Sequence, residues 1–380
     1  MSALFITGGT GFLGSYVVHR LLEETDQRLM LLTRAEDERA GLEKLWRALQ
    51  LHRDAEGFYQ ALPRVELIAG DITAPDLGLD PETRSRVIRE ASSVLHIAAS
   101  LNRRSSTTCF NHNLRGTLAV IKLAQEIDRH RGLKRFSFVS TAAVAGRRSS
   151  EVVREDEAIE WNRPDYDPYA RTKKFCEHMV HELLPETPKT IFRPSIVLGD
   201  SRFPETTQFD MLRAVGFLID FPLRPLDPSA RVDIVNADWV GDAIARLHIK
   251  EHTDHDTYHL SSGLDSKTIG EIESATREAS GPMPKAFAPS LDRTFQRVMK
   301  GLSWMPRGTR AQQIGSLFDV FWPYVTFDTV LDNARATKEL GQHPTPFTEY
   351  GAELYRFAKR VGYRYPYLPL PARNVATPVA

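Results

Sequence analysis

The sequence has few cysteines, no long hydrophobic run and no excess of either charge. Its 380 residues contain two cysteines, Cys109 and Cys176, whose separation fits neither a metal site nor a disulfide framework and so predicts a reducing, cytoplasmic location. Lys plus Arg and Asp plus Glu both number 49, which argues against a basic face for nucleic acid. No stretch reaches the roughly 18 uninterrupted apolar residues of a membrane span. Nucleic acid and membrane are therefore not expected partners.

A metal site is also not expected. His252, Asp254, His255 and Asp256 lie close together in sequence, but no second group of ligands accompanies them. Structural metal sites usually combine ligands from two such groups. We interpret this segment as a solvated loop.

The strongest positive feature is a glycine-rich stretch at residues 7–14. The apolar run 3–6 predicts a buried strand, and residues 15–22 have the apolar spacing of a helix. Between a strand and a helix, Gly8 permits a tight turn, Gly11 leaves room for a pyrophosphate and Gly14 lets the helix pack closely. A dinucleotide would then lie at the helix N-terminus. The predicted contacts are Gly8, Thr10, Gly11, Phe12, Leu13 and Gly14; the alternative is an ordinary strand-to-helix turn.

Strand and helix patterns alternate through the first half of the chain. Apolar runs that predict strands occur at 28–33, 64–69, 93–97, 135–140 and 190–192. Helical patterns lie between them at 36–62, 81–91 and 106–130, and a further helix enters at 165–168 and closes at Pro185. This alternation predicts an α/β fold, a Rossmann-type doubly wound parallel sheet over residues 1–200, with a returning strand near 257–260. His96, inside an apolar strand, is expected to be a core histidine.

The regular alternation stops near residue 200. Residues 201–365 are richer in proline and aromatic side chains, and we expect a smaller, mainly helical substrate lobe there, followed by a flexible tail at 366–380. Residues 312–327 are unusually apolar. Core packing is the favoured interpretation, while a lid, an oligomer face or a lipid-facing surface remain alternatives.

The ends of the predicted strands suggest how a cofactor is chosen and held. Arg34 lies twenty positions beyond Gly14, where an acidic residue favours NAD and an arginine accommodates the 2′-phosphate of NADP. NADP(H) is therefore predicted, although the acidic residues 36–38 leave NAD(H) open. Asp71 and Ile72 could flank the adenine, or Asp71 could cap a turn. The small residues Ala98 and Ala99 would let a cofactor pass close to the sheet.

Three residues form a candidate catalytic set. Tyr169 and Lys173 are four apart and share one helix face, where a lysine ammonium would lower the pKa of the phenol. Thr141 follows a central strand and could contact a bound carbonyl. A tyrosine and a lysine at this spacing are common on helix surfaces, but the glycine turn and Thr141 favour catalysis.

The combination of residues 7–14, Ser140-Thr141, Tyr169-x-x-x-Lys173 and Arg193-Pro-Ser resembles the extended short-chain dehydrogenase/reductases over about the first 260 residues. A narrower resemblance is to the fatty acyl-CoA reductases and to the reductase domains of carboxylic acid reductases and peptide synthetases. It rests on the stretches 31–35, 70–79, 95–102, 113–124, 232–235 and 238–240.

This resemblance implies specific roles. Arg34 and Lys44 would hold the NADP 2′-phosphate, and Thr141, Tyr169 and Lys173 would be catalytic. Further cofactor contacts would come from Asn113, Arg193, Pro194 and Ser195. The resemblance is also compatible with a homodimer.

The leading hypothesis is an NADPH-dependent reductase of an acyl thioester, bound to CoA or to a carrier protein, that yields an aldehyde or an alcohol. Thr141 and Tyr169 would hydrogen-bond the developing oxyanion, and Lys173 would tune Tyr169 and hold the nicotinamide ribose. Arg103 and Arg104 could attract the phosphates of CoA or phosphopantetheine. Alternatives are a sugar-nucleotide epimerase or dehydratase, a hydroxysteroid-type dehydrogenase and a nucleotide sensor without catalysis.

Overall fold

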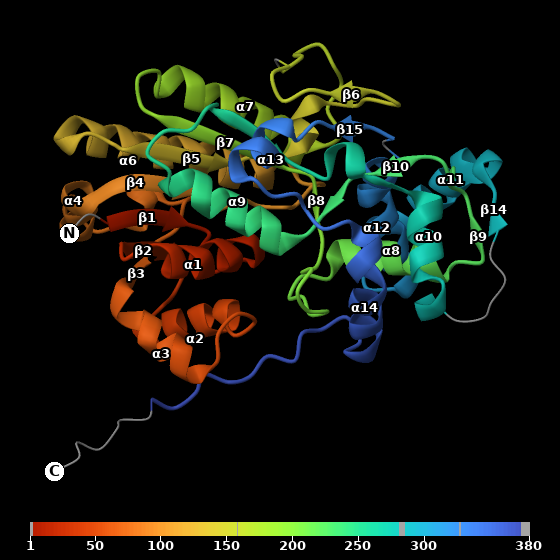
Figure 1. The fold of residues 1–380 in the computed structure, drawn as a ribbon, viewed down its shortest axis with the longest axis horizontal. Coiled ribbons are helices and arrows are strands. Elements are labelled where there is room, and N and C mark those ends of the chain that lie inside the picture. Colours follow the sequence, from red (N-terminus) through yellow and green to blue (C-terminus); the bar gives the residue numbers. More distant parts are fainter. Residues whose placement is uncertain (1–2, 158, 281–285, 327, 374–380) are drawn as a thin grey trace.

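A twisted parallel sheet forms the larger part of the molecule (Figure 1). The computed structural model describes residues 3–157, 159–280, 286–326 and 328–373. Seven strands pair in the order β12-β7-β5-β4-β1-β2-β3, and all neighbours are parallel. Their bounds are β1 Ala3–Thr7, β2 Arg28–Thr33, β3 Val65–Ala69, β4 Ala91–His96, β5 Arg135–Val139, β7 Lys189–Pro194 and β12 Thr257–Leu260. The predicted doubly wound sheet and its returning strand near 257–260 are confirmed.

Helices cover both faces of this sheet. The first face packs against α1 Phe12–Glu24, α2 Glu38–Leu49, α9 Ala237–Ile249 and α13 Ala334–Leu340. The opposite face packs against α4 Pro81–Glu90, α6 Gly116–Arg131 and α7 Pro168–Leu183. Successive strand residues point to opposite faces, so Leu4 and Ile6 enter one core while Ala3 and Phe5 enter the other.

Two of the predicted helices are interrupted. The pattern at 36–62 forms α2 and a separate α3, Ala55–Ala61, because Asp37 and Asp54 each begin a helix by accepting a hydrogen bond from the backbone three residues on. The pattern at 106–130 contains α5 Ser106–Cys109, a π-helical turn at Phe110–Arg115 and then α6. Gly132, with φ of +79°, ends α6 where the sequence predicted.

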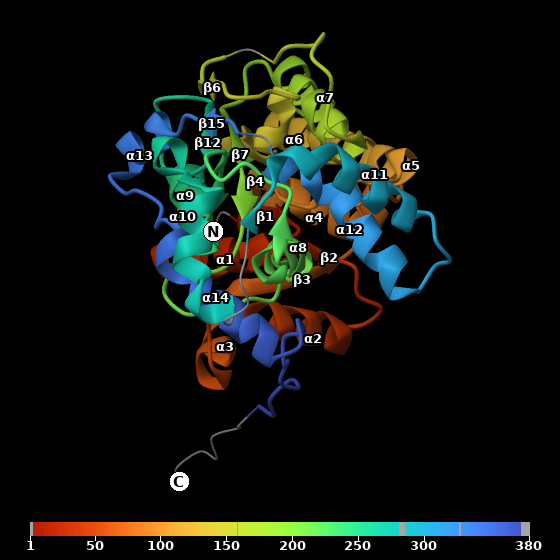
Figure 2. The same cartoon turned by 90° about the vertical axis from the view of Figure 1, so that its right-hand side faces the viewer.

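Much of the C-terminal half forms a second lobe, which lies in front of the sheet in Figure 2. Its helices are α8 Asp210–Asp220, α10 Ile269–Thr276, α11 Asp292–Ser303, α12 Arg310–Val325 and α14 Phe347–Arg360. Short two-stranded pairs complete it: β6 Val152–Val153 with β15 Val330–Leu331, β8 Ile196–Val197 with β11 Ile234–Val235, β9 Leu223–Arg224 with β14 Ala286–Phe287, and β10 Arg231–Val232 with β13 Lys267–Thr268. None of the described helices has both the length and the apolar character needed to cross a membrane.

The apolar segment at 312–327 lies mostly in α12, and residue 327 falls outside the described ranges. Phe318 and Trp322 are buried in the core of the lobe, as the favoured interpretation predicted. Phe321 and Tyr324 instead line the large cavity between lobe and sheet. One helix therefore supports the lobe and also forms part of a cavity wall.

The first part of the predicted tail makes contacts with the sheet domain. Residues 366–373 lie along α2 and α3, where the Trp46 indole Nε1 donates to the Leu368 carbonyl at 3.0 Å and the Leu368 amide donates to Gln50 Oε1 at 2.8 Å. The guanidinium of Arg47 lies 4.4 Å from the centre of the Tyr367 ring. These contacts hold residues 367 and 368 against α2, the flexibility of the tail stays a prediction, and residues 374–380 lie outside the described ranges.

Candidate active site

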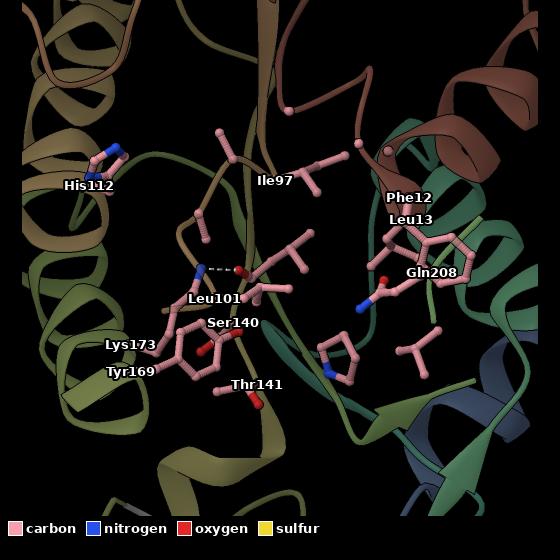
Figure 3. A pocket seen from close by; sticks show the side chains of 18 of the residues that line it. Phe12, Leu13, Ile97, Leu101, His112, Ser140, Thr141, Tyr169, Lys173 and Gln208 are labelled. Carbon is pink, nitrogen blue, oxygen red and sulfur yellow. Dashed lines mark hydrogen bonds between the residues drawn. The ribbon is translucent and has the colours of Figure 1, made fainter. Parts of the chain in front are cut away.

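A cavity of about 570 Å³ lies where the carboxyl ends of the strands meet the lobe. Open α/β sheets bind ligands at this edge. Figure 3 shows Thr141, Tyr169 and Lys173 on one side of the cavity, with Phe12, Leu13 and Gln208 on the other. Most of the predicted site residues line it together: Gly8, Thr10, Gly11, Phe12, Leu13, Gly14, Arg34, Asp71, Ile72, Ala98, Ala99, Thr141, Tyr169, Lys173, Pro194 and Ser195.

The glycine turn has a geometry that side chains would disturb. Gly8 has φ of +78°, and a Cβ there would lie 2.5 Å from the Ala98 nitrogen. A Cβ on Gly14 would lie 2.0 Å from the Gly8 carbonyl oxygen. Gly11 is different, because its Cβ would meet only that same oxygen, at 3.3 Å, and would otherwise extend into the cavity. Gly8 and Gly14 thus shape the turn, and Gly11 leaves the turn accessible from the cavity.

The N-terminus of α1 faces this opening. Gly11 precedes the helix without a side chain to cap it, so the first-turn amides keep their donors available. Helix N-termini carry partial positive charge and favour phosphate groups. The turn therefore offers both space and hydrogen-bond donors for a pyrophosphate.

At the outer rim, Arg34 is exposed and lines the cavity beside Asp71. The carboxylate of Asp71 accepts hydrogen bonds from the amide and hydroxyl of Thr73, both at 2.8 Å. Asp37, one of the acidic residues that left NAD open, accepts from the Ala40 amide at 2.7 Å and caps α2. Arg34 is thus the cationic group at this rim.

Tyr169 and Lys173 both point into the cavity from α7 (Figure 3). Asp167 begins this helix by accepting from the Ala170 amide at 2.8 Å, and Pro168 occupies its first turn. Burial raises the pKa of Tyr169 to about 12, and a hydrogen bond with Thr141 partly opposes that rise. The phenol is therefore protonated at neutral pH.

The Lys173 amine makes its contacts with residues of β5. Its Nζ donates to the Val139 carbonyl at 2.7 Å and lies 4.5 Å from the centre of the Phe138 ring. Burial lowers the pKa of Lys173 to about 8. In this structure the amine is thus directed toward β5 and burial is the largest effect on the pKa of Tyr169, so the predicted action of Lys173 on the phenol stays a prediction.

A model of an NAD-binding family described as "Male sterility protein" matches residues 6–244. The chain belongs to this family. The match confirms the predicted extended short-chain dehydrogenase/reductase type, and with it the oxidoreductase class. It also agrees with the narrower resemblance, because the similar proteins include peptide synthetases and fatty acyl-CoA reductases.

Two curated relatives illustrate the similarity. Nonribosomal peptide synthetase asaC of Aspergillus flavus is 29% identical over 269 residues, which are 68% of this chain and 26% of that protein. Fatty acyl-CoA reductase wat of Drosophila melanogaster is 27% identical over 235 residues, or 54% of this chain and 45% of that protein. The chain thus spans less than half the length of either relative.

Solved structures share the fold. The terminal R domain from the myxalamid PKS-NRPS biosynthetic pathway superposes with a TM-score of 0.80 at 24% identity, covering 96% of this chain and 92% of that one. UDP-glucuronic acid 4-epimerase from Bacillus cereus, in complex with NAD, gives 0.60 at 20% identity, covering 94% and 97%. At these identities the likeness concerns the architecture.

For this member of the male sterility protein family, three predicted cofactor contacts lie away from the cavity lining. Lys44 is exposed on α2. Asn113 is buried, where its Oδ1 accepts from the Ser100 amide at 2.7 Å and its Nδ2 donates to the Thr172 hydroxyl at 3.3 Å. Arg193 donates to the buried carboxylate of Glu177, with its Nη2 2.7 Å from Oε2. Asn113 and Arg193 thus make hydrogen bonds within the protein, and their contact with a cofactor stays a prediction.

His96 lies in the core, and the predicted solvated loop at 252–256 belongs to no metal-ligand group in the described residues. His96 is fully buried, bonded through Nδ1 to the Thr7 hydroxyl at 2.6 Å and through Nε2 to the Thr117 hydroxyl at 3.0 Å. It is the core histidine that the sequence predicted. In the part of the chain that the structure describes, no group of three or more His, Cys, Asp or Glu residues is placed to hold a metal.

Sequence reasoning missed the side of the cavity nearest the lobe. Those lining residues are Leu101, Tyr166, Gln208, Asp210, Met211, Asp233, Phe321 and Tyr324. They come from loops and helices far apart in the chain, so no local spacing links them. The aromatic residues of the 312–327 segment favoured core packing, and the family resemblance of stretches 95–102 and 232–235 assigned no role to Leu101 or Asp233.

Proposed function

We propose that this chain is an NADPH-dependent reductase of an acyl thioester. The observation that carries this proposal is a single cavity that joins the glycine turn and Arg34 to Tyr169 and Thr141 and then opens between apolar lobe side chains. The family membership supports the same reaction class. The reaction needs these parts together, because a dinucleotide and a carbonyl must meet beside a proton donor.

The residues present fit a dinucleotide. Cβ atoms on Gly8 or Gly14 would clash with nearby backbone atoms, so glycine at these positions lets a pyrophosphate approach the backbone closely. Gly11 leaves the glycine turn open toward the cavity. The amides at the start of α1 would hold the pyrophosphate, Arg34 would hold a 2′-phosphate, and Pro194 and Ser195 would line the nicotinamide side. When bound, this cofactor would supply the hydride.

The lobe end of the cavity suits an acyl chain. Leu101, Met211 and Phe321 offer apolar surface there, while Gln208 and Tyr324 add polar groups. Pockets for apolar ligands commonly combine such walls with a few oriented polar atoms. The thioester carbonyl would then lie near Thr141 and Tyr169.

Tyr169 and Thr141 would carry out the proton chemistry. As hydride reaches the carbonyl carbon, both hydroxyls would stabilise the oxyanion, and Tyr169 would give it a proton. The resulting hemithioacetal breaks its C–S bond, the sulfur takes up a proton, and an aldehyde and a free thiol are released. A second round would reduce the aldehyde to an alcohol. The raised pKa of Tyr169 keeps its proton in place before the reaction.

The decisive experiment follows NADPH absorbance with the purified chain and a panel of acyl-CoAs, acyl-pantetheines, aldehydes and sugar nucleotides. Free thiol is measured in parallel with a thiol reagent. One NADPH consumed per thiol indicates an aldehyde product, and two indicate an alcohol. The Tyr169→Phe variant controls for contaminating reductases.

The same panel separates the alternatives. An epimerase would convert a sugar nucleotide without net NADPH oxidation, and a hydroxysteroid-type dehydrogenase would need no thioester. Thioester-dependent thiol release without NADPH consumption would also contradict the proposal. Repeating the assay with NADH tests the assignment of the cofactor.

A further inference from the structure

The loop after β4 brings a second cation to Tyr169. The Arg103 guanidinium carbon lies 4.7 Å from the centre of the Tyr169 ring and 4.3 Å from that of Tyr324 on α12. Its side chain is only 15% exposed. A guanidinium that close to an aromatic ring interacts favourably with it and remains charged at any ordinary pH.

A carboxylate fixes the orientation of this arginine. Arg103 Nη1 donates to Asp167 Oδ2 at 3.2 Å and also to the Tyr324 hydroxyl. The Tyr324 hydroxyl donates in turn to the same Asp167 oxygen at 2.7 Å. The other Asp167 oxygen caps α7 through the Ala170 amide. Thus the loop after β4, the start of α7 and α12 meet at one carboxylate.

Several groups affect the ionisation of Tyr169. Burial raises its pKa most; the positive charge of Arg103 and the hydrogen bond with Thr141 lower it, while Asp167 and the Cys109 thiol raise it. Tyr324, whose ring also lies close to the Arg103 guanidinium, is itself a buried phenol with a raised pKa. Lys173 is on the same helix as Tyr169, but its amine is bound to the Val139 carbonyl.

We propose that Arg103 is a positioning residue for Tyr169, one that holds the ring in the cavity and supplies the positive charge that makes its hydroxyl a better proton donor. Because Arg103 contacts both Asp167 and Tyr324, its position beside Tyr169 depends on how α12 packs against the loop after β4. The kinetic part of this inference rests on the proposed function. It also differs from the expectation that Arg103 attracts a ligand phosphate, since its Nη1 donates to Asp167 and Tyr324 of the protein.

Arg104 provides a matched control. Its guanidinium also reaches α12, where it donates to Ser316 Oγ at 2.8 Å and to Asp319 Oδ2 at 2.9 Å. Its side chain is 42% exposed, on the outer side of the helix. Removing Arg104 therefore weakens the attachment of the loop to α12 and leaves the charge beside Tyr169 in place.

The first test compares Arg103→Gln, Arg103→Lys and Arg104→Gln in NADPH-dependent thioester reduction across pH 6 to 9. Arg103→Gln should lower kcat about tenfold or more, with KM for NADPH unchanged, because a neighbouring charge shifts a buried pKa by about one unit or more. Arg103→Lys should recover part of this loss, and Arg104→Gln should stay within about twofold of the wild type. Equal losses in Arg103→Gln and Arg104→Gln, or no recovery in Arg103→Lys, would overturn the proposal.

The second test needs no substrate. Tetranitromethane attacks the phenolate of tyrosine, so its rate of nitration at Tyr169, read by peptide mass spectrometry at pH 8, reports how readily this phenol ionises. Arg103→Gln should slow that rate about tenfold, while the distant and exposed Tyr367 serves as the internal reference.

These two measurements separate the two proposals. If the wild type reduces no thioester, the proposed function fails, and nitration still tests Arg103. A folded Arg103→Gln protein with unchanged or faster nitration of Tyr169 would contradict the role of Arg103 even where thioester reduction is observed.

Discussion

The glycine turn at the nucleotide end of the cavity comes from a continuous stretch of chain, whereas the lobe end is assembled from distant segments. At the first end, residues 7–14 provide the strand end, the turn and the helix start. At the second, Arg103 binds Tyr324 across 221 positions of sequence. The first end is defined by backbone shape, and the second by side chains that only tertiary packing brings together.

This difference has a consequence for how each end tolerates change. A backbone cradle fails when a single Cβ is added, because carbonyl and amide atoms cannot move aside cheaply. A wall of side chains can repack, so its changes should alter preference and rate more than folding. The two ends should therefore differ in how they respond to substitution.

Tyr169→Phe acts where the two ends meet. Removing the hydroxyl should lower kcat about 10²- to 10⁴-fold, because proton donation and one oxyanion contact are lost. NADPH affinity, measured by fluorescence titration, should remain close to that of the wild type. A variant with full turnover would contradict the catalytic role of Tyr169. A loss of NADPH affinity as large as the loss of kcat would show that Tyr169 also contributes to the nucleotide end of the cavity.

Gly14→Ala tests the backbone cradle directly. The new Cβ would lie 2.0 Å from the Gly8 carbonyl oxygen, so α1 must shift. We expect a loss of about 3 kcal/mol in the free energy of unfolding and about 100-fold weaker NADPH binding, measured by urea denaturation and titration. Gly301→Ala is the control, because its Cβ on α11 meets no atom within 4 Å and should be neutral or slightly stabilising. Equal effects of the two changes would contradict this account.

Arg34→Asp tests the side chain that accompanies the cradle. Replacing a cation by an anion beside the 2′-phosphate should weaken NADPH binding about tenfold to 100-fold, while NADH binding changes little. Isothermal titration with both cofactors measures the ratio. Equal losses for NADPH and NADH would exclude the assignment of Arg34 to the phosphate.

The buried carboxyl of Glu155 connects β12 and α13 and is expected to make the stability of the protein depend on pH. Its carboxylate accepts from the His259 amide of β12 at 2.9 Å and from the Arg335 amide of α13 at 2.5 Å. Burial raises the pKa of Glu155 to about 7 from its usual value near 4.5, so the folded state holds a proton that the unfolded state releases. Stability from this group is therefore fully present below pH 4.5 and falls as the pH rises through 7.

Glu155→Gln should remove this pH dependence because an amide does not titrate. Between pH 5 and pH 8, the wild type should lose about 1 to 2 kcal/mol more unfolding free energy than the variant, as measured by urea denaturation at both pH values. Parallel pH profiles would show that the carboxyl ionises normally in the folded protein.

Much of the fold could be predicted because its signals are local. The strand-turn-helix at 3–24 and the end of α6 at Gly132 each depend on residues adjacent in sequence. The single helix expected at 36–62 was wrong because Asp54 starts a new helix, a capping preference that the apolar pattern conceals.

The sequence likewise predicted which residues of the candidate site lie together, but not the contacts that their side chains make. The spacing of Tyr169 and Lys173 places both on one helix face and predicts that they share a cavity. It does not give the direction of the Lys173 amine, which follows from the Val139 carbonyl on a neighbouring strand. The contact of Arg193 was also not predictable, because Arg193 on β7 pairs with Glu177 on α7 and no sequence spacing indicates this pair.

The sequence by itself determined the parallel sheet, the glycine turn, the order of strands and helices and the helix face that carries Tyr169, because each follows from periodicity or from the conformational freedom of glycine. The tertiary structure alone decided which charge lies beside the phenol and which lobe residues close the cavity. Those outcomes depend on side chains separated by most of the chain, whose contacts are fixed only when the lobe packs against the carboxyl edge of the sheet.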